Sequence, residues 1–350
     1  MSQKTDIAEK KTQSGADQAP DDSVAEAPSS MTAQSKPPRL AVSSSAKVGL
    51  ALGGGIARGW AHIGAVRRLD ELGLSPDIVA GTSVGALVGG FWRAGKLDEL
   101  EGWARSLTKR RMLSYFDVVL NGSGLMGGKK LEKTMNRYLP PTNIEDMPGR
   151  FVAVTSELST GHEVWMIDGD LAEAMQAAYA LPGIFPPRAI DGRWLIDGAL
   201  VNPLPVSVCR ALGARVVIAI GLHADAFNIG VADRKEKFNA LPNIGGSNAG
   251  DDIDAASKGG ITEKLMLRRL FNANPNAPGV GSVMLASFNI LMDRITRSRL
   301  AGDPPDVMIT PHVGHIPLLD FDRADELIGH GRDAVDEALP QIESALKYLT

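Results

Sequence analysis

The sequence predicts an α/β protein built around a parallel sheet, and two observations near the start of its folded part support this. Short apolar runs at 47–52 and 78–80 enclose a helical pattern, which is the order of a βαβ unit with a right-handed crossover. Each run leads into a glycine-rich turn, at 53–59 and at 81–85. Because parallel sheets bind ligands at the carboxyl ends of their strands, we expect both turns to face one site.

Composition limits the function classes before any motif is considered. The chain has 350 residues, of which 44% are hydrophobic, so it can bury a substantial core. Its net charge of −4 argues against a nucleic-acid partner. The single cysteine, Cys209, excludes an internal disulfide and fits a reducing compartment. No apolar signal-peptide core follows Met1, so we expect a cytoplasmic protein.

Two segments of polar, low-complexity composition indicate the domain organisation. Residues 1–45 are rich in Ser, Ala, Asp, Lys and Pro, and they contain too few large apolar side chains to offset the entropy cost of ordering. We expect a disordered tail there and one folded domain at 46–350. A second polar stretch at about 224–260 predicts a flexible insertion inside this domain, followed by a helical C-terminal part.

The turn at 81–85 has the pattern of a nucleophile elbow. It reads Gly81-Thr-Ser83-Val-Gly85 and lies between an apolar strand and a helical segment. In such a turn the serine has strained backbone geometry, and glycines on both sides relieve the crowding between strand and helix. Ser83 is therefore the candidate nucleophile, and Gly81 and Gly85 are the elbow glycines.

The first turn, Gly53-Gly54-Gly55, predicts an oxyanion hole. A dinucleotide fingerprint would need glycine where Arg58 stands, and the Gly-Lys-Ser/Thr ending of a phosphate loop is absent. An oxyanion hole needs only backbone N–H groups that point outward, which three consecutive glycines can supply. We assign Arg58 to the same loop, where its guanidinium can bond nearby carbonyl groups.

The helix that follows this turn, at 60–72, has an apolar face and ends before a glycine. Further elements follow in chain order. Helices are expected at 129–138, 171–179, 263–271, 282–300 and 322–348, paired strands at 151–157 and 163–167, and a last strand at 306–310.

Two of the later segments bear on the site. The proline-rich apolar loop at 181–187 is expected to form one wall of an acyl-binding pocket. The helix at 282–300 carries Met284, Phe288, Leu291 and Ile295 at helical spacing. This face either packs on the sheet or meets lipid as an interfacial helix, and both interpretations stay open.

Asp197 completes the set of candidate catalytic residues. It ends a short apolar strand and directly precedes Gly198. A carboxylate in a partly buried place needs a hydrogen-bond partner. An Asp-Gly pair alone usually marks a turn, but together with a serine elbow and a triple-glycine loop it indicates catalysis.

These motifs, in this order, closely resemble those of the patatin-like phospholipases, most of all the bacterial branch related to neuropathy target esterase. The resemblance covers roughly residues 47–222 and, more loosely, the segment to about 340. It implies a three-layer α/β/α fold, a dyad of Ser83 as nucleophile and Asp197 as base, and acyl esters of phospholipids, lysophospholipids or neutral lipids as substrates. One position departs from the pattern, because Ile56 stands where the family has a further glycine. If that position needs a positive φ, the isoleucine is strained.

The chemistry of such a dyad requires no metal and no organic cofactor. The expected partner is a lipid or another acyl ester, with peripheral membrane contact as a further expectation. Two alternatives stay open. One is a Ser–His–Asp esterase that uses His312 or His315, and the other is a non-catalytic lipid-binding adaptor.

Overall fold

The computed structural model describes residues 47–108, 111, 129–223 and 280–347. These residues all belong to one compact unit, Pro37–Thr350. The tail expected at 1–45, the insertion expected at about 224–260 and the helix expected at 263–271 lie outside the described residues.

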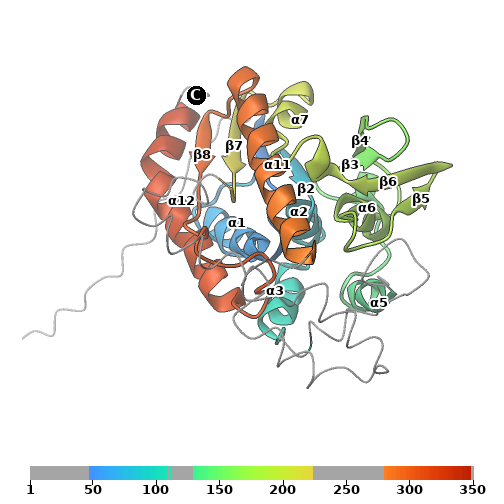
Figure 1. Cartoon of the computed structure of the whole chain (residues 1–350). Coiled ribbons are helices and arrows are strands. Elements are labelled where there is room, and N and C mark those ends of the chain that lie inside the picture. Colours follow the sequence, from blue (N-terminus) through green and yellow to red (C-terminus); the bar gives the residue numbers. More distant parts are fainter. Residues whose placement is uncertain (1–46, 109–110, 112–128, 224–279, 348–350) are drawn as a thin grey trace, which may run out of the picture. The chain divides into compact units, whose positions relative to one another are not determined.

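The described residues form an eight-stranded sheet (Figure 1). Its order is β5-β6-β3-β2-β1-β7-β8, with β4 also paired to β3. The run from β3 to β8 is parallel, and β4, β5 and β6 are antiparallel to their neighbours. The mostly parallel α/β sheet predicted from the sequence is therefore confirmed. The strands are β1 (Val48–Leu52), β2 (Ile78–Thr82), β3 (Arg150–Glu157), β4 (Glu163–Met166), β5 (Arg188–Ile190), β6 (Arg193–Asp197), β7 (Val216–Ile220) and β8 (Val307–Ile309).

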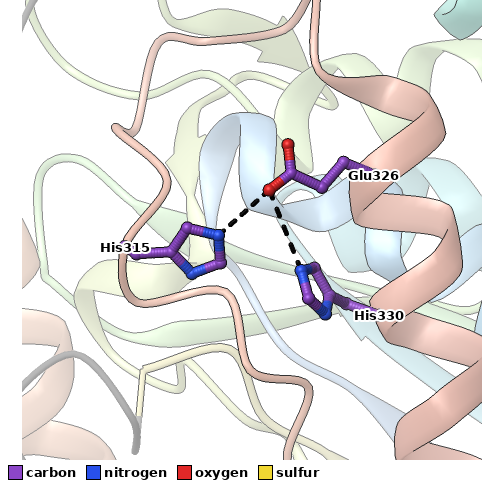
Figure 2. Close-up of side chains that lie close together, drawn as sticks. All are labelled: His315, Glu326 and His330. Carbon is purple, nitrogen blue, oxygen red and sulfur yellow. Dashed lines mark hydrogen bonds and ion pairs between the residues drawn. The ribbon is translucent and has the colours of Figure 1, made fainter.

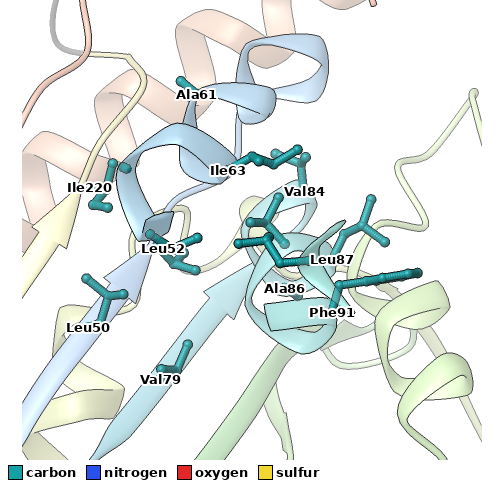
Figure 3. Close-up of a cluster of buried hydrophobic side chains, with 14 of the residues drawn as sticks. Leu50, Leu52, Ala61, Ile63, Val79, Val84, Ala86, Leu87, Phe91 and Ile220 are labelled. Atoms are coloured by element: carbon teal, nitrogen blue, oxygen red, sulfur yellow. The ribbon is translucent and has the colours of Figure 1, made fainter. Parts of the chain in front are cut away.

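Helices cover both faces of this sheet, because the strand side chains alternate between two apolar clusters. Leu50 and Leu52 of β1 belong to the larger cluster, while Ala51 between them belongs to the smaller one. Side chains of the first two helices meet the larger cluster (Figure 3), and one short helix packs on the smaller cluster. This arrangement gives the three layers that the family resemblance implies. The helices are α1 (Ala61–Glu71), α2 (Val84–Arg93), α3 (Leu97–Arg105), α5 (Lys129–Tyr138), α6 (Leu171–Ala178), α7 (Val206–Ala211), α11 (Val280–Gly302) and α12 (Ala324–Lys347).

Most of the expected elements are present at the expected residues. The helix at 129–138 matches α5, and the paired strands match β3 and β4. No strand is expected from the sequence at β5 or β7. The terminal helices expected at 322–348 form a single helix, α12, which continues through Pro340.

The side chains expected on the apolar face of α11 are not its buried ones. The buried side chains are Leu285, Met292 and Asp293, whereas Met284 and Leu291 are each 43% exposed. Of the two interpretations, packing on the sheet therefore does not hold for Met284 and Leu291. Lipid contact by the exposed side chains stays a prediction, which a vesicle-binding assay would test. None of the helices in the described ranges has the length and apolar character that crossing a membrane requires.

Helices α1 and α12 approach each other closely through two glycines. A Cβ at Gly331 of α12 would lie 1.8 Å from the carbonyl oxygen of Ala61. A Cβ at Gly64 of α1 would likewise lie 1.8 Å from the carbonyl oxygen of Ile328. Since these contacts are to backbone, a side chain at either position forces the two helices apart.

We expect Gly331→Ala to lower the free energy of unfolding by about 2 kcal/mol, because overpacking a close helix contact costs that much. Gly329→Ala is the matched control in the same helix, since no atom lies within 4 Å of its added Cβ. It should raise the free energy of unfolding by up to about 1 kcal/mol through helix propensity. Urea unfolding of both variants measures the difference, and equal effects would contradict the close-contact explanation.

Candidate active site

Ser83 occupies a strained turn between β2 and α2. Its φ is 56° and its ψ is −127°, a conformation that non-glycine residues rarely adopt. A Cβ at Gly81 would lie 2.5 Å from the backbone nitrogen of Ala86, and one at Gly85 would lie 2.2 Å from the carbonyl oxygen of Leu52. The two glycines therefore allow strand and helix to meet around Ser83.

Asp197 contacts Ser83 directly, although the two lie 114 residues apart in the chain. The Ser83 hydroxyl donates to Oδ2 of Asp197 over 2.7 Å, and the Ala199 N–H donates to Oδ1 over 2.8 Å. The carboxylate is 1% exposed. This burial raises the pKa of Asp197 to about 7, while the two hydrogen bonds lower the pKa and only partly offset the loss of hydration.

The middle of β3 brings these two side chains together. Thr82, the last residue of β2, pairs with Val154 of β3, and Asp197 pairs with the next residue, Thr155. A Cβ at Gly198 would lie 2.2 Å from the carbonyl oxygen of Val154. The backbone after Asp197 therefore needs glycine to approach β3 this closely.

Of the three glycines predicted to form the oxyanion hole, two have N–H groups that already donate hydrogen bonds to backbone carbonyls. Gly53 donates to the carbonyl of Ile220 over 3.1 Å, and Gly54 donates to the carbonyl of Pro203 over 2.9 Å. Gly54 nevertheless lies beside the serine, because a Cβ on it would be 3.4 Å from the Ser83 Cβ.

The next two N–H groups in the loop, those of Gly55 and Ile56, donate no hydrogen bond to a backbone carbonyl of the described residues. Among residues 47–108, 111, 129–223 and 280–347, no acceptor contacts the N–H of Gly55 or of Ile56. They lie at the N-terminus of the short 3₁₀ helix Ile56–Trp60, where unsatisfied donors are expected. These two N–H groups are therefore the donors of the loop that are left for a ligand.

Arg58 ties the glycine loop to a segment more than 250 residues away. Its Nε donates to the carbonyl of Ile316 over 2.8 Å, and its Nη2 donates to the carbonyl of Gly314 over 3.0 Å. The neighbouring Ala57 N–H donates to the carbonyl of Leu318 over 3.1 Å. Carbonyl partners for Arg58 are expected from the sequence, but only the tertiary structure shows which carbonyls they are.

Two buried histidines that were not predicted as site residues lie near the same loop, and His62 bonds it directly. His62 Nε2 lies 2.7 Å from the carbonyl oxygen of Gly53 and must carry the proton to bond it. His223 Nδ1 lies 3.1 Å from Oδ1 of Asn289. Burial lowers the pKa of each histidine to about 4, so both rings are neutral at pH 7. His62 is the second residue of α1, and nothing in the neighbouring sequence indicates that it bonds the glycine loop.

Ser83 opens into an apolar cavity. The loop at 181–187 contributes three of its side chains, as expected for one wall. The remaining walls come from α2, α3, α5, the end of α6, the glycine loop and the segment before α12. The aromatic side chains in these walls belong to no sequence motif, so the sequence did not predict them. The lining residues are Ile56, Trp60, Ser83, Val84, Leu87, Trp103, Leu107, Leu131, Tyr179, Leu181, Ile184, Phe185, Leu319 and Phe321.

Ile56 has a φ of 53°, so the position where the family has glycine does need a positive φ. A β-branched residue in this region is a genuine outlier and costs about 1–2 kcal/mol. Its side chain lines the cavity next to Ser83. The strain expected from the sequence is therefore confirmed, and it lies at the site itself.

His312 and His315, the alternative triad partners, have other neighbours. His312 Nε2 lies 3.6 Å from Oε2 of Glu337, and His315 Nε2 lies 3.0 Å from Oε1 of Glu326 (Figure 2). Both histidine side chains are more than half exposed, whereas Asp197 is buried.

Comparison with known proteins finds the same family that the sequence motifs resemble. The family model for patatin-like phospholipases matches residues 50–210. An uncharacterized NTE family protein of Mycobacterium tuberculosis is 33% identical over 340 residues, which cover 87% of this chain and 94% of that protein.

Larger proteins match over shorter parts of their length. Neuropathy target esterase of Drosophila melanogaster is 32% identical over 180 residues, which cover 49% of this chain and 13% of that protein. Lysophospholipase nte1 of Neurospora crassa is 26% identical over 300 residues, which cover 84% of this chain and 18% of that protein.

We expect Ile56→Gly to be more stable than Ile56→Ala by about 1 kcal/mol, because only glycine adopts this φ without strain. Both variants lose the same cavity contacts, so their difference isolates the backbone. Ala57→Gly is the control, since at an ordinary position glycine is the less stable residue. Urea unfolding measures all three, and an alanine variant at least as stable as the glycine variant would contradict strain at Ile56.

Proposed function

Because this chain belongs to the patatin-like phospholipase family, in the branch of the neuropathy target esterases, and is a lipid acyl hydrolase, we propose that it cleaves phospholipid or lysophospholipid esters through an acyl-Ser83 intermediate. The observation that carries this proposal is the 2.7 Å hydrogen bond from the Ser83 hydroxyl to the Asp197 carboxylate. A serine is a weak nucleophile until a positioned base accepts its proton, and Asp197 is in place to do so.

Acylation then follows from the geometry. As Ser83 Oγ attacks the ester carbonyl, its proton moves to Oδ2 of Asp197, while the Ala199 N–H holds Oδ1 in place. A pKa near 7 suits a base that must both accept and return a proton at neutral pH. Asp197 next gives the proton to the leaving alcohol. Water, deprotonated by the same carboxylate, then releases the fatty acid.

We assign the oxyanion donors to the N–H groups of Gly55 and Ile56, since those of Gly53 and Gly54 are bonded to carbonyls. The start of a helical turn also favours negative charge. Each donor in such a hole contributes about 3 kcal/mol to transition-state stabilisation. Arg58 acts on this hole indirectly, by fixing the loop to the carbonyls of Gly314 and Ile316.

The cavity beside Ser83 supports an acyl chain as the bound group. Apart from Ser83, its lining is apolar or aromatic, which favours burial of methylene groups at about 0.8 kcal/mol each. This chemistry selects the acyl portion of the substrate and places no constraint on the head group.

The contacts of Asp197 favour the dyad over the two alternatives. Its carboxylate oxygens accept from Ser83 and Ala199, and His312 and His315 pair with surface glutamates instead. A lipid-binding adaptor would have no need for a serine held in strained geometry against a buried carboxylate.

We expect Ser83→Ala and Asp197→Asn to abolish hydrolysis of a short p-nitrophenyl ester, because one removes the nucleophile and the other removes the base without changing its shape. His312→Ala and His315→Ala should each keep kcat/KM within about tenfold of the parent, a loss of about 1.4 kcal/mol. The measurement is kcat/KM together with fluorophosphonate labelling, with circular dichroism as the folding control. A folded histidine variant as inactive as Ser83→Ala would establish a triad.

The pH dependence follows from the raised pKa of Asp197. Only the ionised carboxylate accepts a proton, so kcat/KM should rise with pH to a plateau through an apparent pKa near 7. An aspartate of ordinary pKa would keep the enzyme active to about pH 4. An unchanged circular dichroism spectrum at pH 5 excludes unfolding as the cause, and a profile flat down to pH 5 would refute the assignment.

The ionisation of Asp197 also affects the stability of the protein, which can be measured without substrate. Since the folded-state pKa of Asp197 lies above its unfolded value, its contribution to stability is fully present below the unfolded pKa and is lost as pH rises through about 7. Asp197→Asn should therefore raise the melting temperature more at pH 8 than at pH 5.

A further inference from the structure

Three metal-ligating side chains gather near the start of α12, outside the catalytic site (Figure 2). His315 comes from the segment between β8 and α12, and Glu326 and His330 lie one turn apart on α12. Their ligand atoms all lie within 4.8 Å of one another. We propose that they form a binding site for a divalent transition-metal cation of the Zn²⁺ type.

The distances fit such an ion. His315 Nε2 is 3.0 Å and His330 Nε2 is 3.9 Å from the same oxygen, Oε1 of Glu326. Two ligands that each lie about 2.05 Å from a tetrahedral ion are about 3.3 Å apart. The observed distances lie on either side of this value, so small side-chain rotations are enough to bind the cation.

The donor set selects the kind of cation. Two imidazole nitrogens and one carboxylate oxygen suit Zn²⁺, Co²⁺ and Ni²⁺, whereas Ca²⁺ and Mg²⁺ require oxygen ligands. Three protein ligands leave the fourth position to water. The side chains are 29–51% exposed, so a cation can enter directly from solvent.

Arg323 limits the affinity of this site and also orients it. Its Nε donates to Oε2 of Glu326 over 2.7 Å, and its Nη2 donates to Oε1 over 2.6 Å. A cation on Oε1 displaces the second contact and keeps the first, which then holds the carboxylate as a supporting hydrogen bond. The competition for Oε1 predicts weaker binding than at a closed structural zinc site.

The site is connected to the oxyanion loop through one short segment. His315 lies between Gly314 and Ile316, whose carbonyls are the acceptors of Arg58. Leu319, further along the same segment, lines the apolar cavity. A cation that joins His315 to α12 therefore restrains the segment that anchors the loop carrying Gly55 and Ile56.

The test is a titration of the untagged full chain with ZnCl₂ after removal of metals by a chelator. Calorimetry should find one site in the wild type, and saturating Zn²⁺ should raise the melting temperature by a few degrees. MgCl₂ at the same concentration should leave it unchanged. Tetrahedral Co²⁺ should give visible d–d absorption in the wild type.

Variants decide which residues hold the cation. His315→Ala and His330→Ala should each weaken Zn²⁺ binding at least tenfold and abolish the Co²⁺ absorption. His312→Ala, three residues before His315 and likewise more than half exposed, is the matched control and should bind within twofold of the wild type. Circular dichroism confirms that each variant folds.

Absence of one-site binding in the wild type, or equal binding by the wild type and both ligand variants, would overturn the proposal. A loss in His312→Ala equal to that in His315→Ala would do the same. All these measurements are made without substrate, so their outcome is independent of whether Ser83 and Asp197 catalyse hydrolysis.

Discussion

The candidate site depends on the pairing of β3, whose first and last parts pair with two different strands. The first part of β3 pairs in parallel with β2, and its last part pairs in the opposite direction with β6. The carboxyl ends of β2 and β6 consequently meet at adjacent residues, Val154 and Thr155. Two residues more than a hundred positions apart are thereby placed within one hydrogen bond of each other.

Several unfavourable features are concentrated around this meeting point. Ser83 and Ile56 both have a positive φ, and Asp197 has lost its hydration. Each lowers stability, and each is tolerated because the surrounding core is closely packed and leaves no relaxed alternative. The strained and buried residues of the candidate site are therefore maintained by the rest of the fold.

The local parts of this arrangement could be predicted from the sequence, and the long-range parts could not. The elbow and the glycine loop have patterns of a few residues, and the strain at Ile56 follows from one departure in such a pattern. The partners of Arg58 lie more than 250 residues away, so no window on the sequence contains them. The buried face of α11 could not be predicted for a related reason, because Met284 and Leu291 fit an amphipathic pattern as well as Leu285 and Met292 do. Only the surface that the helix packs against decides between the two.

The close contact between α1 and α12 has a consequence for the order in which the protein can form during synthesis. Helix α1 is among the first described elements to leave the ribosome, yet the groove at Gly64 is filled by α12, which is made some 260 residues later. The segment that receives Arg58 and closes the cavity directly precedes α12. A nascent chain that already contains Ser83 and Asp197 therefore still lacks the acceptors of Arg58 and the cavity lining at Leu319 and Phe321. The candidate site is therefore complete only after the last described helix has been made and has docked on α1.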